Sequence, residues 1–279
     1  MSTANEPLLV IKPRRRGNLF PLRDVLEYRD LLYILALRDI KLRYRQTAVG
    51  VAWVLLQPLI GAGLFTFVFG VIADMPTGDE RVPYFVFGYT GLLLWNAFIQ
   101  IFLKTNDSMV VNSGLVSKIY FPRMVLPIST VYGVMLDFAV GAVVMVVLMV
   151  VYSIMPGLPL LFFPVALLLA ILFALGLGLC AAALNVSYRD VRHVVPVFSQ
   201  FLLWASPVAY AASSIPQSVK WLVALNPMVG ILDSFRWAIL GTPVTSWGSV
   251  VWSAVASVLM FIAGLVIFQR SERRFADVI

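Results

Sequence analysis

Residues 125–151 read VLPISTVYGVMLDFAVGAVVMVVLMVV, an apolar run with a single charged side chain, Asp137. A helix rises about 1.5 Å per residue, so a run of this length crosses the ~30 Å hydrocarbon core of a membrane. The run is continuous rather than alternating, which favours a helix over a barrel strand. Five similar runs lie at 49–72, 84–103, 160–184, 194–212 and 248–268. The sequence therefore predicts an all-α integral membrane protein with six transmembrane helices.

The composition of the whole chain agrees with this fold class. Hydrophobic residues make up 61% and charged residues 13% of the sequence, whereas soluble domains carry about 25% charged residues. Cys180 is the only cysteine, so neither a disulfide nor a cysteine-based metal site forms within one chain.

The basic residues are distributed unevenly among the segments between the predicted spans. If the N-terminus is inside, 18 of the 21 Lys and Arg residues fall in inner segments and three fall in outer segments. This bias predicts that both termini are cytoplasmic. It also accounts for the net charge of +7 without a nucleic-acid partner. We expect a cytoplasmic tail over 1–21, a transmembrane domain over 22–270 and a second cytoplasmic tail over 271–279.

Residues 22–45 precede the first span and have the pattern of a helix lying at the cytoplasmic membrane surface. One polar stripe contains Glu27, Asp30, Arg38, Lys41 and Arg45, and apolar residues cover much of the remaining surface. This pattern is typical of an amphipathic interfacial helix. A simple topological anchor is the alternative interpretation.

Residues 104–123 form the longest inner loop. Asn106 and Asp107 are suitable N-caps for a short helix, and the loop ends in KIYFPR at 118–123. An Ile-Tyr-Phe cluster between charged residues is consistent with docking to a partner protein. It is equally consistent with an aromatic belt at the membrane surface.

Residues 213–247 lie on the outer side of the predicted topology. They are too apolar for a free loop, and Pro216, Pro227 and Gly241 interrupt them too often for one span. We expect two short helices that dip into the outer leaflet. Asp233 and Arg236 are spaced to pair at i,i+3, which lowers the cost of partial burial.

Several chemistries are absent from the sequence. No G-x-x-x-x-G-K-[ST] motif occurs, so the chain does not bind ATP through a P-loop. His193 is the only histidine, and it is expected at the surface rather than in a metal site. No H-x-x-x-x-D or D-x-D pattern supports a membrane-bound transferase, and Asp137 alone makes a poor proton relay, so a structural role is expected for it. We assign no catalytic residue and no metal ligand.

Three stretches together resemble a known family. They are RDIKLRYRQTAVGVAWVLLQPL at 38–59, KIYFPR at 118–123 and NVSYRDVRH at 185–193. With six spans and apolar outer helices before the last one, the chain resembles the permease subunit of bacterial polysaccharide-exporting ABC transporters. Members of that family export O-antigen, capsule, teichoic acid and similar polymers. A drug or small-lipid ABC exporter permease of the same fold is the alternative.

The resemblance implies an architecture that composition alone does not show. It implies a homodimer in the bacterial inner membrane that encloses a channel for a lipid-linked polysaccharide. Two separate ATP-binding subunits would bind ATP and magnesium, and this chain would need no cofactor. The surface helix resembles the gate helix of the family, with Arg38, Lys41, Arg43 and Arg45. The inner loop resembles its coupling helix, with Lys118, Ile119, Tyr120, Phe121, Pro122 and Arg123, and 213–247 resembles its outer re-entrant helices.

A path for the sugar chain is predicted from aromatic and amide side chains within the spans. Lipid does not need Gln or Asn, so faces that carry them are expected to point inward. Aromatic rings can hold the apolar face of a pyranose, and amides can bond its hydroxyls. The alternative is that the aromatic residues pack helices together or lie in interfacial belts. The predicted path consists of Trp53, Gln57, Phe87, Trp95, Asn96, Phe98, Gln100, Gln200 and Trp204.

The predicted topology can be tested by labelling single cysteines in a variant without Cys180. A cysteine at Ser113 should react with a membrane-impermeant thiol reagent only from the cytoplasmic side, and one at Thr77 only from the outer side. The Lys/Arg asymmetry is the physical reason. Labelling of both positions from the same side would contradict the topology.

Overall fold

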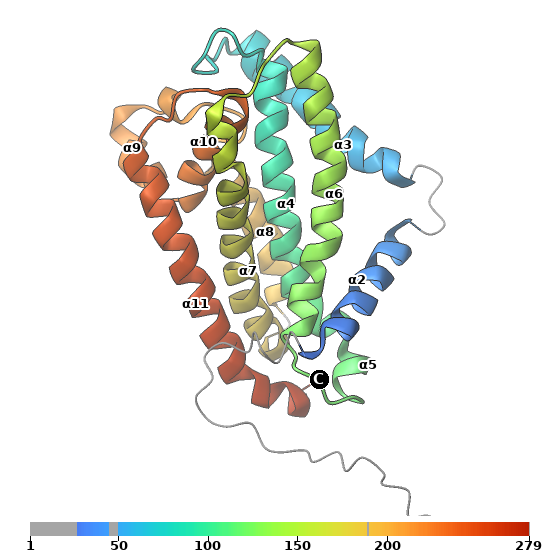
Figure 1. Ribbon diagram of the computed structural model, residues 1–279. Coiled ribbons are helices and arrows are strands. Elements are labelled where there is room, and N and C mark those ends of the chain that lie inside the picture. The colour runs from blue at the N-terminus through green and yellow to red at the C-terminus, as the bar shows by residue number, and fades with distance from the viewer. Residues whose placement is uncertain (1–26, 45–49, 189, 279) are drawn as a thin grey trace, which may run out of the picture.

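The computed structural model describes residues 27–44, 50–188 and 190–278 of the chain. Within these ranges the regular structure is helical throughout, and the helices form one elongated bundle (Figure 1). Five long helical segments run along it. They are α3 (Gly50–Phe65) continued by the π-helix η1 (Thr66–Ile72), α4 (Tyr84–Val111), α6 (Val125–Val151), the 3-10 helix η2 (Leu158–Phe162) continued by α7 (Phe163–Ser187), and α11 (Trp247–Val278).

All five segments are long and apolar enough to cross a membrane. They coincide with five of the six predicted spans, although α4 and α11 extend well past the predicted ends. Helix α6 is continuous from Val125 through Pro127. Pro127 lies in the first turn of the helix, where a missing backbone N–H costs no hydrogen bond.

The remaining predicted span, 194–212, is only partly helical. Helix α8 (Val191–Trp204) has 14 residues, which corresponds to about 21 Å at 1.5 Å per residue. Pro207 explains the early end, because its ring lacks an N–H and disfavours helical geometry in the residue before it. An irregular segment, 205–211, therefore continues the chain from α8 toward the end of the bundle at which α4 begins. We call this segment the α8 break.

Two short helices follow the α8 break, as the sequence predicted. They are α9 (Gln217–Ala224) and α10 (Pro227–Leu240), and their axes meet at 95°. Asn226 caps α10 by accepting a hydrogen bond from the backbone N–H of Met228 at 3.0 Å, and Gly241 ends it with a φ of 72°. Both helices lie in the upper part of the bundle in Figure 1, an arrangement consistent with re-entrant helices.

The core of the bundle is built around α4, which packs against α6, α7 and α10. The contact between α7 and α11 depends on glycine. Gly264 lies against the backbone of Gly176, and a Cβ atom at Gly176 would come within 2.6 Å of the Met260 carbonyl. Small residues that let two backbones approach closely are typical of helix pairs in membranes.

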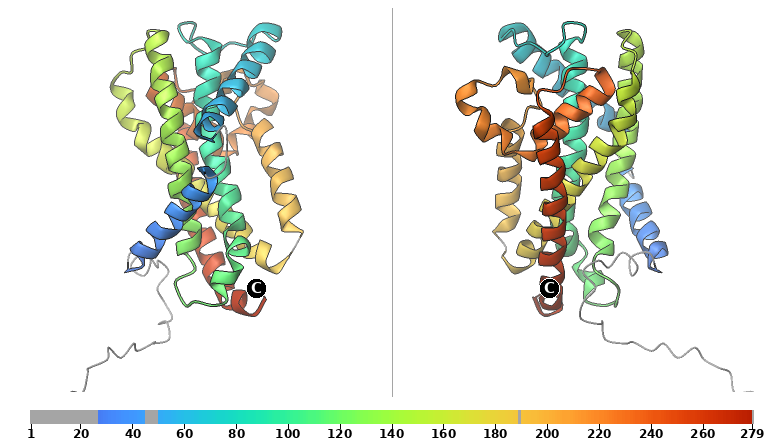
Figure 2. Two further views of the ribbon diagram at one scale, coloured as in Figure 1. Left: turned by 90° about the vertical axis from the view of Figure 1, so that its right-hand side faces the viewer. Right: turned by 60° about the vertical axis from the view of Figure 1, so that its left-hand side comes forward.

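The loops occupy the two ends of the bundle in the grouping that the sequence predicted. Residues 73–83 and 241–246 lie at one end, whereas 112–124, the start of α8 and the end of α11 lie at the other (Figure 2). The separation of predicted outer from predicted inner loops is therefore confirmed. Which end faces the cytoplasm stays a prediction.

Helix α2 (Arg29–Tyr44) packs against α6 toward the end of the bundle that holds residues 112–124. Leu32 and Leu35 are buried in a cluster with Phe121, Met124 and Val125. Its position relative to the membrane surface stays a prediction. The side chain of Arg43 and the whole of Arg45 lie outside the described residues.

The expected caps of the inner loop are wrong. Asn106 and Asp107 lie within α4, and the short helix that follows is α5 (Ser113–Val116), which begins after Asn112. The α4 sequence stays helix-compatible past Lys104, so the helix continues beyond the apolar run for two more turns.

Candidate translocation path and coupling segment

The α4 aromatic residues of the predicted path face the interior of the single chain. Phe87, Trp95 and Phe98 are all nearly inaccessible to solvent. The Trp95 and Phe98 ring centroids are 5.3 Å apart, and Phe98 stacks on Phe173 of α7 at 5.6 Å. In this arrangement these three rings join helices together, as the packing alternative proposed, and they leave little surface accessible from outside the chain.

The other six residues of the predicted path are accessible to different degrees. Trp53, Gln57, Gln200 and Trp204 are exposed, and Asn96 and Gln100 are half-buried. They lie on three helices, α3, α4 and α8, and both α3 and α8 contact α4. Aromatic and amide groups therefore remain accessible on three helices that are linked through α4. We call these six residues the α3–α4–α8 set.

The α8 break is held by a buried arginine on α10. The Nη1 atom of Arg236 donates to the carbonyl of Pro207 at 2.7 Å, and Nη2 donates to the carbonyl of Val208 at 2.6 Å. The guanidinium also lies 3.7 Å from the centre of the Phe87 ring. Arg236 is 2% exposed, so these contacts take the place of water at Nη1 and Nη2, whereas its buried Nε–H has no hydrogen-bond partner. Irregular backbone at membrane depth is tolerated only where protein satisfies its polar groups in this way.

Two further side chains bind the same stretch of backbone. The Tyr84 hydroxyl at the start of α4 donates to the carbonyl of Ala209. The Asn226 amide donates to the carbonyl of Ala205 at 3.1 Å and to the Ser206 hydroxyl at 2.9 Å. The α8 break is thus fixed to both α4 and α10 by side chains rather than by a helical backbone ladder.

Gly91 makes room for this arrangement. A Cβ atom at position 91 would overlap the Arg236 Nη2 atom and would lie 2.7 Å from the Val208 carbonyl oxygen. Phe87 and Gly91 are one helical turn apart on α4. The same face of α4 therefore supplies the ring that lies against the guanidinium and the space that the guanidinium occupies.

The prediction that Arg236 pairs with Asp233 was wrong. The Asp233 carboxylate instead accepts a hydrogen bond from the backbone N–H of Thr245 at 2.7 Å, and no salt bridge joins the two side chains. Sequence reasoning missed the contact between Arg236 and α8, although a signal was present. Pro207 leaves carbonyls unsatisfied within an apolar stretch, and an arginine in the next apolar segment is a suitable donor.

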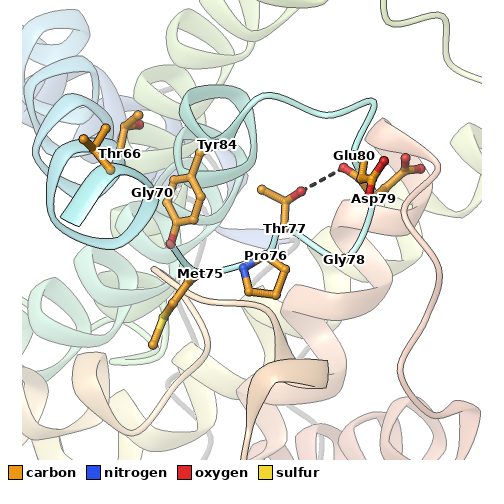
Figure 3. Close-up of a pocket in the computed structure, with 10 residues that line it drawn as sticks. Thr66, Gly70, Met75, Pro76, Thr77, Gly78, Asp79, Glu80 and Tyr84 are labelled. Carbon is orange, nitrogen blue, oxygen red and sulfur yellow. Dashed lines mark hydrogen bonds between the residues drawn. The ribbon is translucent and has the colours of Figure 1, made fainter. Parts of the chain in front are cut away.

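A pocket of about 540 Å³ opens at the end of the bundle where α4 begins. Figure 3 shows the Tyr84 ring at one side of it, and Thr77, Asp79 and Glu80 of the 73–83 loop at the other. The Thr77 hydroxyl donates to the carbonyl of Asp79 at 2.8 Å. Hydrogen bonds from Arg81 lower the pKa of the Asp79 carboxyl, so it is charged at neutral pH. The pocket therefore combines one aromatic ring with hydroxyl and carboxylate groups.

The coupling segment at 118–123 divides into exposed and buried residues. Ile119 and Tyr120 project from the protein, with Tyr120 71% exposed, and Lys118 is also exposed. Phe121 is buried in the same cluster as Met124 of the following turn. Of the three apolar residues Ile119, Tyr120 and Phe121, only the first two are exposed enough to contact another protein.

Polar contacts join the region around this segment to three other helices. Arg38 of α2 donates to the Asn112 side chain at 2.8 Å. Asn185 of α7 donates to the carbonyl of Asn106 at 3.1 Å, and Arg123 donates to the carbonyl of Glu272 in α11. Arg38 therefore joins the predicted gate helix to the 104–123 loop, and Leu32 and Leu35 of the same helix share a cluster with Phe121 of the predicted coupling segment. The sequence did not indicate either contact.

Two other residues singled out in the sequence lie apart from these sites. His193 is exposed near the start of α8, as expected. Asp137 is half-buried on α6, and its structural role stays a prediction.

These features define a multi-pass membrane protein with an irregular, side-chain-bound break in one span and an exposed apolar tip at one end. Residues 30–240 match the family model described as ABC-2 type transporter, and the chain belongs to that family.

Relatives support the same conclusion. The chain is 31% identical to the O-antigen export system permease protein RfbA of Myxococcus xanthus, over 91% of this chain and 97% of the relative. It is 28% identical to RfbA of Klebsiella pneumoniae, over 90% and 95%. It is 23% identical to the polysialic acid transport protein KpsM of Escherichia coli, over 85% and 92%.

Replacing Arg236 should destabilise the protein. Arg236→Met leaves the Pro207 and Val208 carbonyls without their donors, and we expect the free energy of unfolding to fall by about 2–4 kcal/mol. Arg236→Lys keeps the charge but cannot donate through a planar fork. Its free energy of unfolding should therefore lie between those of the wild type and Arg236→Met. Denaturation of the purified protein in detergent measures both changes.

Arg192→Met is the matched control, because Arg192 is an exposed arginine on α8, the helix that precedes the α8 break. It should unfold like the wild type. A wild-type unfolding curve for Arg236→Met would show that the guanidinium does not hold the α8 break.

Proposed function

We propose that this protein is the membrane-spanning subunit of an ABC exporter that moves a lipid-linked polysaccharide across the bacterial inner membrane. Membership of the ABC-2 type transporter family supports a transport role. The relatives named above are permeases for O-antigen and polysialic acid and align over most of their length. They favour a polysaccharide over the alternative substrates, a drug or a small lipid.

ATP would be bound and hydrolysed, with magnesium, by two separate ATP-binding subunits on the cytoplasmic side. This chain has no P-loop, so it needs a partner for that step. The exposed pair Ile119 and Tyr120 is the observation that carries this proposal. It projects from a segment bonded to the rest of the bundle through Arg123.

The contacts around 105–123 give a route for the coupling. A movement of the docked partner against Tyr120 would act on α11 through Arg123 and on α2 through Asn112 and Arg38. Helix α2 would then serve as the gate helix. Of its four predicted gate residues, Arg38 and Lys41 are the two whose side chains the structure describes. The contacts with α7 through Asn185 extend the same route into the core.

The polysaccharide would pass between two copies of the chain along the α3–α4–α8 set. Its aromatic rings, Trp53 and Trp204, offer apolar surfaces to sugar rings, and its amides offer hydrogen bonds to hydroxyls. Phe87, Trp95 and Phe98 would support this surface from behind. The pocket beside Tyr84 lies at the outer end of the same helix α4 and would contact the polymer as it leaves. Neither surface selects one sugar, which suits a long polymer.

Replacing the exposed apolar pair should uncouple transport from ATP hydrolysis. We expect Ile119→Ala with Tyr120→Ala to lower surface polysaccharide at least tenfold, because docked aromatic anchors often contribute ~2 kcal/mol or more each. Surface polymer, export-subunit levels and co-purification of the ATP-binding subunit are measured in a strain that lacks the native chain.

Ser117→Ala is the matched control, because Ser117 is exposed beside the pair and has no apolar surface to dock. It should support normal export. A strain without the chain that still displays its surface polysaccharide would overturn the proposed substrate. Normal co-purification and export in the double variant would overturn the docking role alone.

A further inference from the structure

A second pocket lies where α9, the start of α10 and the start of α11 meet. Its volume is about 410 Å³, and its walls are mainly apolar, with Ile215, Val223, Val229 and Trp252 among them. It shares no lining residue with the α3–α4–α8 set, with the pocket beside Tyr84 or with the coupling segment. The proposed export function leaves it unused.

The pocket contains one cation. Lys220 is half-buried and lines it, and no salt bridge or hydrogen bond from its ammonium occurs within the described part of the chain. The only acid between 213 and 247 is Asp233, which is already bonded to the backbone N–H of Thr245. The Lys220 ammonium is not among the buried side-chain atoms that lack a partner, so it remains accessible to an anionic group that enters the pocket.

The rim of the pocket is apolar and exposed. Leu225 of α9 and Trp252 of α11 line the pocket and are exposed. Trp221 and Leu222, their neighbours on α9, are each more than half exposed. The Trp252 indole N–H donates to the carbonyl of Leu225 at 3.2 Å and so ties the end of α9 to α11. In a membrane protein such a rim contacts lipid, and Trp at this position is typical of the boundary between hydrocarbon and headgroups.

We propose that this pocket binds one anionic phospholipid of the surrounding membrane. An acyl chain fills the apolar cavity, and the phosphate lies against the Lys220 ammonium. The hydroxyls of Thr245, Ser246 and Ser249, which also line the pocket, bond the headgroup. The lipid thereby braces the α9–α10 pair against α11. This site is independent of the proposed export function and of which end of the bundle faces the cytoplasm.

Photo-crosslinking tests the proposal on the full-length protein in phosphatidylcholine nanodiscs. The probes are phosphatidylglycerol and phosphatidylcholine, each at the same trace level and each with a diazirine in one acyl chain. Mass spectrometry locates the crosslinks. We expect them between 215 and 252, about fivefold more frequent for phosphatidylglycerol, because one basic residue near anionic headgroups contributes ~1 kcal/mol.

Two pairs of variants separate the contributions of charge and cavity. Lys220→Gln should remove the preference for phosphatidylglycerol, whereas Arg81→Gln, an exposed cation at the same end of the bundle, should keep it. Ala224→Trp fills the pocket and should abolish crosslinking of both probes. Val219→Trp adds the same ring to α9 outside the pocket lining and should not. Size-exclusion profiles confirm that each variant is folded.

Three results would overturn the proposal. They are equal crosslinking of the two probes in the wild type, an unchanged preference in Lys220→Gln, and crosslinks that persist in this segment in a folded Ala224→Trp variant. A lipid that crosslinks only elsewhere on the chain would overturn it equally.

Discussion

The carbonyls of Pro207 and Val208 lie inside the protein, and the half of the bundle in which α4 begins depends on how they are satisfied. Pro207 ends α8 too early for a complete helical span, so the backbone beyond it has no helical hydrogen bonds. Arg236 supplies the missing donors at 2.7 and 2.6 Å. Because Arg236 belongs to α10 and lies against Phe87 of α4, one cation fixes the relative positions of three helices.

At the opposite end, polar side chains fix the region around the predicted coupling segment to the neighbouring helices. Arg38, Asn185 and Arg123 connect the 105–123 region to α2, α7 and α11. The apolar middle of the bundle contains few such directional contacts and is held by packing, including the glycine contact between α7 and α11. Specific polar bonds at the two ends and non-specific packing between them suit a protein whose ends respond to ligands while the spans move as units.

Periodicity and length sufficed to predict five complete spans, the two short helices before the last of them and the grouping of the loops. They failed at 194–212, because hydropathy does not register that Pro207 ends the helix eight residues early. They also could not separate Trp95 and Phe98, which pack inside, from Trp53 and Trp204, which are exposed, since an aromatic residue has the same hydropathy on either face. The partners of Arg236, Val208 and Pro207, lie 28 and 29 residues away in the sequence, and no local pattern specifies such contacts.

The account depends most on the claim that Arg236 and Tyr84 hold one and the same segment, the α8 break. A double-mutant cycle with Arg236→Met and Tyr84→Phe measures this directly in the free energy of unfolding. If both side chains fix the α8 break, removing one lowers the contribution of the other, and the two effects depart from additivity by about 0.5–3 kcal/mol. Effects that add within about 0.5 kcal/mol, as for independent sites, would contradict the account.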